Sequence, residues 1–90
     1  MPTAEQLVAQ GQRLYQEGSW QQALPLLQEA LGLEANHAQV LHLLGLIALQ
    51  SGRPQQAADA FGRALASRPD DPELLTLLGA AWQAVGRFER

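Results

Sequence analysis

The sequence predicts an all-α chain in which antiparallel helix pairs follow one another as structural repeats. Apolar residues recur at the three- and four-residue spacing of a helix face, and no alternating strand pattern competes with it. The same features return after 34 residues, a period that is typical of stacked repeat proteins. Two series of glycines mark this period: Gly11, Gly45 and Gly79, and Gly18, Gly52 and Gly86.

Composition limits the classes of function. The 90 residues suit one small domain with a formal net charge of −3, and the six basic residues are all arginines spread along the chain. No basic stripe could follow a phosphate backbone, so we expect no nucleic-acid partner. The chain has no cysteine, which excludes disulfides and thiolate chemistry. The most apolar run, Val40 to Leu49, is too short to cross a bilayer, and no signal peptide is visible, so we expect a cytoplasmic protein without membrane contact.

The first helix is predicted to run from about Ala4 to Glu17. Thr3 can cap it, with Gln6 as the reciprocal partner in a capping box. Gly18 should end the helix, because glycine accepts the left-handed conformation that a tight helix stop requires.

The second helix is predicted to begin at Trp20, where Ser19 and Gln22 repeat the capping-box spacing. Pro25 lies inside its apolar pattern, removes one backbone hydrogen bond and should bend the helix. A later start near Leu24, with the preceding residues forming a turn, is the alternative.

The third and fourth helices are predicted on either side of a turn at residues 51–53. Asn36, with Gln39 at the capping-box spacing, is the expected cap of the third helix, which should extend to about Gln50. Pro54 suits the first position of the fourth helix, where a missing N–H is harmless, and this helix should reach about Ser67.

The fifth helix has a strong start signal. A capping aspartate is followed by Pro72 in the first turn and by Glu73, whose charge complements the positive helix end. We expect this helix to stop at Gly86 and a sixth helix to begin at about Arg87, by analogy with the earlier units.

One repeat carries small and apolar residues at positions that identify its type. Within the second unit these residues are Leu41, Leu44, Gly45, Ala48, Ala57, Phe61, Ala64 and Pro69. This pattern resembles the tetratricopeptide repeat, a helix–turn–helix unit of 34 residues. The first unit departs from it at Gln10 and Ala35. The resemblance implies a right-handed superhelix of about two and a half repeats, with units at residues 4–37 and 38–71 and a partial unit at 72–90.

The resemblance also implies a concave surface, lined by the first helix of each pair, that binds a peptide or protein segment. The residues assigned to this surface are Glu5, Val8, Gln12, Tyr15, Gln39, His42, Leu46, Leu49, Glu73, Thr76, Ala80 and Gln83. Leu46 and Leu49 could instead pack inside the stack, because a helix that is apolar all round is usually buried. His42 and Tyr15 could likewise be packing residues rather than ligand contacts.

No catalytic or metal site is expected. The sequence shows no paired carboxylates on one face, no serine or cysteine beside a histidine, and no phosphate-binding loop. His37 and His42 lack the i, i+4 spacing of a helical metal site, so we expect neither metal nor cofactor. Some members of the resembled family clamp a C-terminal carboxylate with basic side chains, and that mode is disfavoured because the chain has no lysine.

The expected function is therefore that of a non-enzymatic interaction or scaffolding module. We also expect self-association through the last helix, or further repeats beyond Arg90, because the apolar face that a sixth helix would cover is left open. The residues assigned to this oligomer interface are Leu74, Leu78, Ala81, Val85 and Phe88. An alternative is the N-terminal repeat region of a larger bacterial enzyme, glycosyltransferase-like or sulfotransferase-like, that recruits a substrate or partner. A designed repeat is disfavoured by irregularities such as Gln10 and Pro25.

Overall fold

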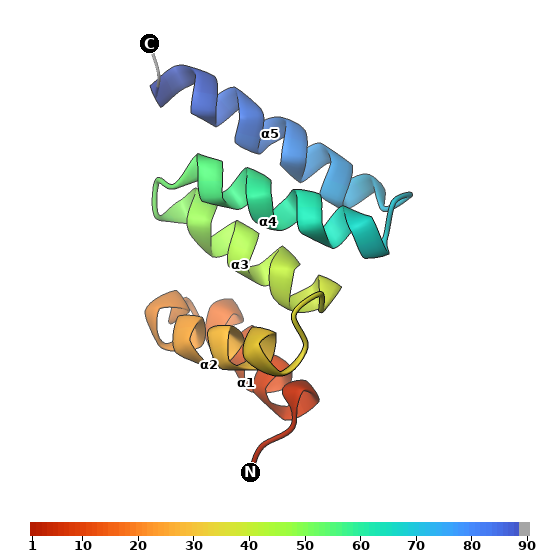
Figure 1. Cartoon of the computed structure of the whole chain (residues 1–90). Helices are drawn as coiled ribbons and strands as arrows, with labels where there is room; N and C mark the ends of the chain where they lie inside the picture. The colour runs from red at the N-terminus through yellow and green to blue at the C-terminus, as the bar shows by residue number, and fades with distance from the viewer. Residues whose placement is uncertain (89–90) are drawn as a thin grey trace.

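Five helices stack in chain order from one end of the molecule to the other (Figure 1). The structure is a computed structural model that describes residues 1–88, and the side chains of residues 1–87. The helices are α1 (Ala4–Gln16), α2 (Trp20–Leu33), α3 (Ala38–Gln50), α4 (Pro54–Ser67) and α5 (Pro72–Phe88). No strand occurs among these 88 residues, so the predicted all-α class of helix pairs is confirmed.

Two of the predicted helix starts form as expected. At α1, the backbone N–H of Gln6 donates to Thr3 Oγ1 at 3.2 Å, and the Thr3 N–H donates to Gln6 Oε1 at 2.9 Å. At α5, Asp71 Oδ1 accepts from the N–H groups of Glu73 and Leu74 at 3.0 and 3.2 Å. Both caps satisfy N–H groups that have no partner inside the helix.

The other two capping predictions are wrong. Ser19 precedes α2 but makes no side-chain hydrogen bond there. The cap of α3 is His37 and not Asn36, with His37 Nδ1 accepting from the Val40 N–H at 3.4 Å. The capping-box spacing misled here because Gln39, the expected reciprocal partner, directs its amide to another helix.

Helix α2 begins at Trp20 with Pro25 inside it, so the alternative of a later start is wrong. Ala23, Leu27 and Ala30 are all fully buried, and they hold the whole length of α2 against its neighbours. Pro25 itself is exposed. Packing of the buried face therefore outweighs the backbone hydrogen bond that the proline removes.

The glycine turns behave as predicted in the first two units and differently in the third. Gly18 and Gly52 adopt left-handed conformations with φ of 84° and 75°. Gly86 lies inside α5, which continues to Phe88, so the expected stop at Gly86 and the sixth helix at Arg87 are wrong. Glycine permits a left-handed stop but does not impose one.

The core consists of two clusters that share α3. Val40, Leu43 and Ile47 of α3 pack with residues of α1 and α2, while Leu41 and Ala48 pack with residues of α4 and α5. Within each helix pair a glycine allows close approach. Leu27 lies over Gly11, and Phe61 lies over Gly45, where a Cβ atom would come within 2.7 Å of Phe61 Cζ. Helix α3 is therefore the central element of the fold.

Candidate functional site

The predicted binding residues lie on α1, α3 and α5, the first helix of each unit, and we call this side the first-helix face. Three polar contacts join neighbouring helices across it. Gln39 Nε2 donates to Gln12 Oε1 at 2.7 Å, and Gln50 Nε2 donates to Tyr15 Oη at 2.9 Å. Between α3 and α5, His42 Nε2 lies 3.3 Å from Glu73 Oε1. The fold therefore brings residues from all three repeats into one continuous surface.

Residues of this face differ in how much surface they offer. Glu5, Ala80 and Gln83 are exposed, and so is Thr76, whose hydroxyl donates to the Pro72 carbonyl at 2.9 Å. Val8 is only 8% exposed and packs in the core cluster formed by α1, α2 and α3, so it lies beneath the surface and not on it.

Leu46 and Leu49 occupy an intermediate position. Both are half-buried and pack against the second core cluster. Each therefore contributes to helix packing and still leaves part of an apolar side chain at the surface.

His42 is the most unusual polar residue of the first-helix face. Its Nε2 atom is shielded from solvent and forms no hydrogen bond, since the nearby Glu73 carboxylate lies outside hydrogen-bonding geometry. The imidazole ring also packs near Phe61, with the ring centroids 6.4 Å apart. A shielded polar atom without a hydrogen-bond partner is costly, and the group nearest to it is the Glu73 carboxylate of the same chain.

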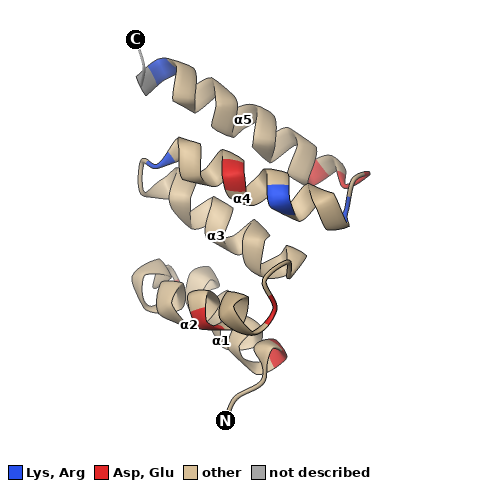
Figure 2. Cartoon of the chain, in the orientation of Figure 1, with Lys and Arg blue, Asp and Glu red and all other residues tan. Residues whose placement is uncertain are grey.

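The charge of the first-helix face is acidic. Among the twelve assigned residues, Glu5 and Glu73 carry carboxylates and none is a lysine or an arginine. The arginines visible in Figure 2 lie on α4, in the loops beside it and at the end of α5, and Arg13 lies in the last turn of α1. This distribution disfavours an anionic ligand such as a free C-terminal carboxylate.

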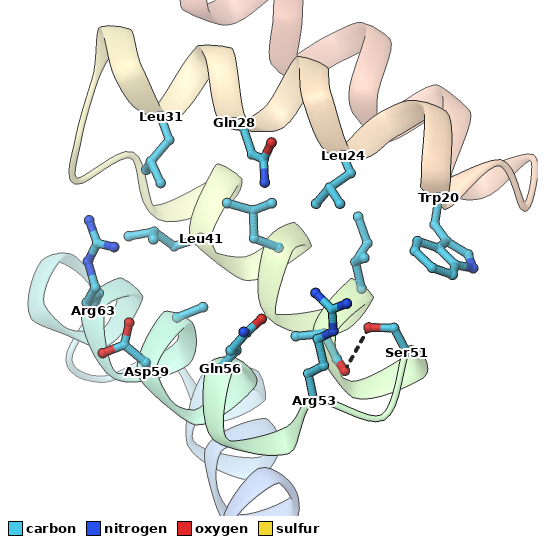
Figure 3. Close-up of a pocket in the computed structure, with 14 residues that line it drawn as sticks. Trp20, Leu24, Gln28, Leu31, Leu41, Ser51, Arg53, Gln56, Asp59 and Arg63 are labelled. Atoms are coloured by element: carbon cyan, nitrogen blue, oxygen red, sulfur yellow. Dashed lines mark hydrogen bonds between the residues drawn. The ribbon is translucent and has the colours of Figure 1, made fainter.

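A hollow that the sequence analysis did not predict lies between α2, α3 and α4 and has a volume of about 280 Å³ (Figure 3). Its α3 residues include Leu44 and Ile47, which lie on the side of the helix away from Leu46 and Leu49. Gln28 of α2 and Gln56 of α4 line the hollow on opposite sides. The volume is close to the lower limit of small-ligand pockets. Repeat periodicity could not reveal this site, because it depends on the distance between α2 and α4.

The residues assigned to the oligomer interface are not the open surface of α5, which corrects that prediction. Leu74, Ala81 and Val85 are 1%, 0% and 9% exposed because they face the preceding helices, and Leu78 is half-buried. Phe88 lies outside the residues whose side chains are described. The exposed large residues of α5 are instead Leu75 and Trp82. The described residues assigned to the interface therefore form a buried face of α5 that lies next to the exposed face with Leu75 and Trp82.

No cluster of three or more potential metal ligands occurs in the described part of the chain. None of its helices is long and apolar enough to cross a membrane.

Comparison with known proteins identifies the repeat. The family model for the tetratricopeptide repeat matches residues 14–81 and 48–90, and a search of curated proteins found no match. Repeats of this family generally mediate protein–protein interactions, and they are typically non-catalytic modules that bind protein partners. Because the matches extend over most of its residues, this chain belongs to the tetratricopeptide repeat family.

Proposed function

We propose that this chain is an interaction module that binds an extended peptide segment along the first-helix face. The observation that carries the proposal is the series of polar contacts that joins α1, α3 and α5 on this side. These contacts align side chains from three repeats along one path. A peptide lying on that path would cross all three helices.

The polar groups of this face have hydrogen-bonding capacity left for a ligand. In the contact between Gln12 and Gln39, one amide uses its oxygen and the other uses its nitrogen. The remaining groups are the Gln12 NH₂ and the Gln39 oxygen, a donor and an acceptor. A peptide backbone presents the same two kinds of group, so it can pair with both.

The charge and the apolar residues define the chemistry of the peptide. The acidic character of the face favours a neutral or basic segment, and the half-buried Leu46 and Leu49 provide contacts for an apolar side chain. We therefore propose a neutral or basic peptide with at least one large apolar residue. The proposal assigns no catalytic role and no cofactor to these residues.

Peptides selected by display on the purified chain provide a direct test. Replacing His42, Leu46 and Leu49 together with serine should weaken binding of a selected neutral or basic peptide by at least about tenfold, or 1.4 kcal/mol. The matched control replaces Gln28 and Gln56, exposed residues beside the opposite hollow, with alanine. Circular dichroism must show that both variants keep their helices. Unchanged affinity in the folded triple variant would refute the assignment of this face.

We also propose that the chain self-associates through α5, that it is cytoplasmic and that it continues into further repeats. The alternative of a larger bacterial enzyme also remains a prediction. The parent gene discriminates between them, since more than about 300 further residues in the same reading frame would be enough for an additional catalytic domain.

A further inference from the structure

One face of α5 is open where the corresponding faces of the earlier units are covered. Leu75 is 52% exposed, whereas Leu41 and Leu7, at the same position of the repeat, are 1% and 2% exposed. Trp82, one turn beyond Gly79 along this stripe, is 57% exposed. We define the open face of α5 by four residues that follow one stripe of the helix: Leu75, Gly79, Trp82 and Gly86.

The earlier units show what normally occupies this place. Gly11 is covered by Leu27 and Gly45 by Phe61, each from the antiparallel second helix of its pair. A Cβ atom built at Gly79 meets nothing within 4 Å, and the same holds at Gly86. The open face therefore has, at Gly79, the shape that receives a large apolar side chain from an antiparallel helix. Gly86 corresponds to Gly18 and Gly52, which also meet nothing within 4 Å, and it leaves further room on the same face.

The four residues of this face are themselves complementary to such a surface. They alternate large, small, large and small, with steps of 4, 3 and 4 residues. The order of these spacings is therefore the same whether the helix is followed from its start or from its end. In an antiparallel pair of two α5 helices, Leu75 of each copy therefore meets Gly86 of the other, and Trp82 meets Gly79. A twofold interface requires a surface that is complementary to itself in this way.

We propose that α5 pairs antiparallel with α5 of a second copy of this chain, with Trp82 of each copy covering Gly79 of the other. This inference rests on the self-association included in the proposed function, and it assigns the interface to a different face from the buried Leu74 and Ala81.

The charges at the two ends of α5 favour the same arrangement. Asp71 and Glu73 stand at its start and Arg87 stands at its end (Figure 2). Antiparallel pairing brings the acidic start of each helix near the basic end of the other, and it also aligns the two helix dipoles favourably. Parallel pairing would place like charges together.

One helix pair is a small interface, so the dimer should be weak and reversible. Specific interfaces below about 1,200 Å² of total buried area belong to transient complexes. By sedimentation equilibrium, the average mass should rise from one chain toward two between about 10 µM and 1 mM, the range in which weak complexes form.

Two variants test the face. Gly79→Leu should remain folded, because the space above Gly79 is empty within one chain, but it should weaken dimerisation at least about tenfold by blocking Trp82 of the partner. Leu75→Glu should do the same by placing a charge in the interface. The matched control is Leu33→Glu, which alters a leucine of similar exposure (57%) on α2 and should leave the dimer unchanged.

Cross-linking tests the direction of pairing, since the chain has no cysteine of its own. A mixture of Leu75→Cys and Gly86→Cys chains should form a mixed disulfide dimer on mild oxidation, because facing residues of packed helices come within disulfide range. Each variant alone should cross-link poorly. Like positions are 11 residues apart along the pair, or about 16 Å.

Each remaining outcome overturns the inference in a recognisable way. Efficient cross-linking of Leu75→Cys with itself would indicate parallel pairing. A dimer that survives both Gly79→Leu and Leu75→Glu would place self-association on another surface, which leaves the proposed peptide binding along the first-helix face standing. A chain that stays monomeric at about 1 mM would refute self-association as well, and would leave a helix from a longer gene product as the occupant.

Discussion

The contact between Gly45 and Phe61 makes a strong prediction about stability. Gly45→Ala adds one methyl group to α3 at the point where α4 crosses it. The new Cβ atom would lie 2.7 Å from Phe61 Cζ and 2.8 Å from Cδ1, well inside the normal contact distance. Phe61 is fully buried, so its ring cannot relieve the contact by turning out into solvent. One of the two helices must shift.

The magnitude follows from two opposing effects. Replacing glycine by alanine inside a helix stabilises it by about 1 kcal/mol, whereas overpacking a core costs about 1–3 kcal/mol. Because three ring atoms are affected, we expect a cost near the upper value and a net loss of about 1–2 kcal/mol at Gly45. At Gly79 the same substitution meets no atom and should increase the free energy of unfolding by about 0.5–1 kcal/mol.

Thermal unfolding followed by circular dichroism measures both variants, at a few micromolar to keep the chain monomeric. A change of 1 kcal/mol shifts the Tm of a chain this size by about 4–8 °C, so the two variants, about 1.5–3 kcal/mol apart, should differ in Tm by about 6–24 °C. Gly11→Ala should fall between them, because it meets the flexible end of Leu27.

The double variant Gly45→Ala/Phe61→Leu tests the cause. It reproduces the smaller leucine found over Gly11 and should destabilise the chain by less than the sum of the two single changes. If Gly45→Ala were as stable as Gly79→Ala, the close packing of α3 on α4 would be refuted.

Two further substitutions test how α5 and α2 are held. Asp71→Ala removes the acceptor that caps two N–H groups, so it should lower the free energy of unfolding by about 1 kcal/mol in a urea titration. The control is the exposed neighbour, and Asp70→Ala should change this free energy by less than about 0.5 kcal/mol. Equal effects would contradict the capping role. Pro25→Ala should raise the stability by about 2 kcal/mol, since an exposed helix-interior proline is replaced by a residue that restores the bond to the Gln21 carbonyl. A loss of stability would show that the chain requires the proline geometry.

Sequence signals at helix ends predicted the helices correctly where the residue had a single possible role, such as a cap or a first-position proline. Thr3 with Gln6 formed the expected capping box, and Pro54 stands at the first position of α4. The prediction failed at Asn36, because a capping-box spacing does not show whether its glutamine is needed elsewhere. Gln39 contacts Gln12, 27 residues earlier, and local sequence carries no information about such a contact.

The candidate site was predictable only in outline. Periodicity placed Gln12, Gln39 and His42 on first helices, but their contacts depend on how closely α1, α3 and α5 approach one another. Val8 illustrates the limit, because the family resemblance placed it on the binding surface whereas packing encloses it. The hollow between α2 and α4 had no sequence signal at all.

The 34-residue period and the residue types within it were sufficient to predict the repeat family and the helix order. These features follow from residue size and spacing along the chain. The buried side of α5 was different. Leu74 and Leu75 are adjacent and equally apolar. The period equates Leu75 with the buried Leu41 and Leu7, yet the position of α4 buries Leu74 and leaves Leu75 exposed. A helix that is apolar on several sides receives its orientation from its neighbours, and the tertiary structure therefore decides which face remains open to a partner.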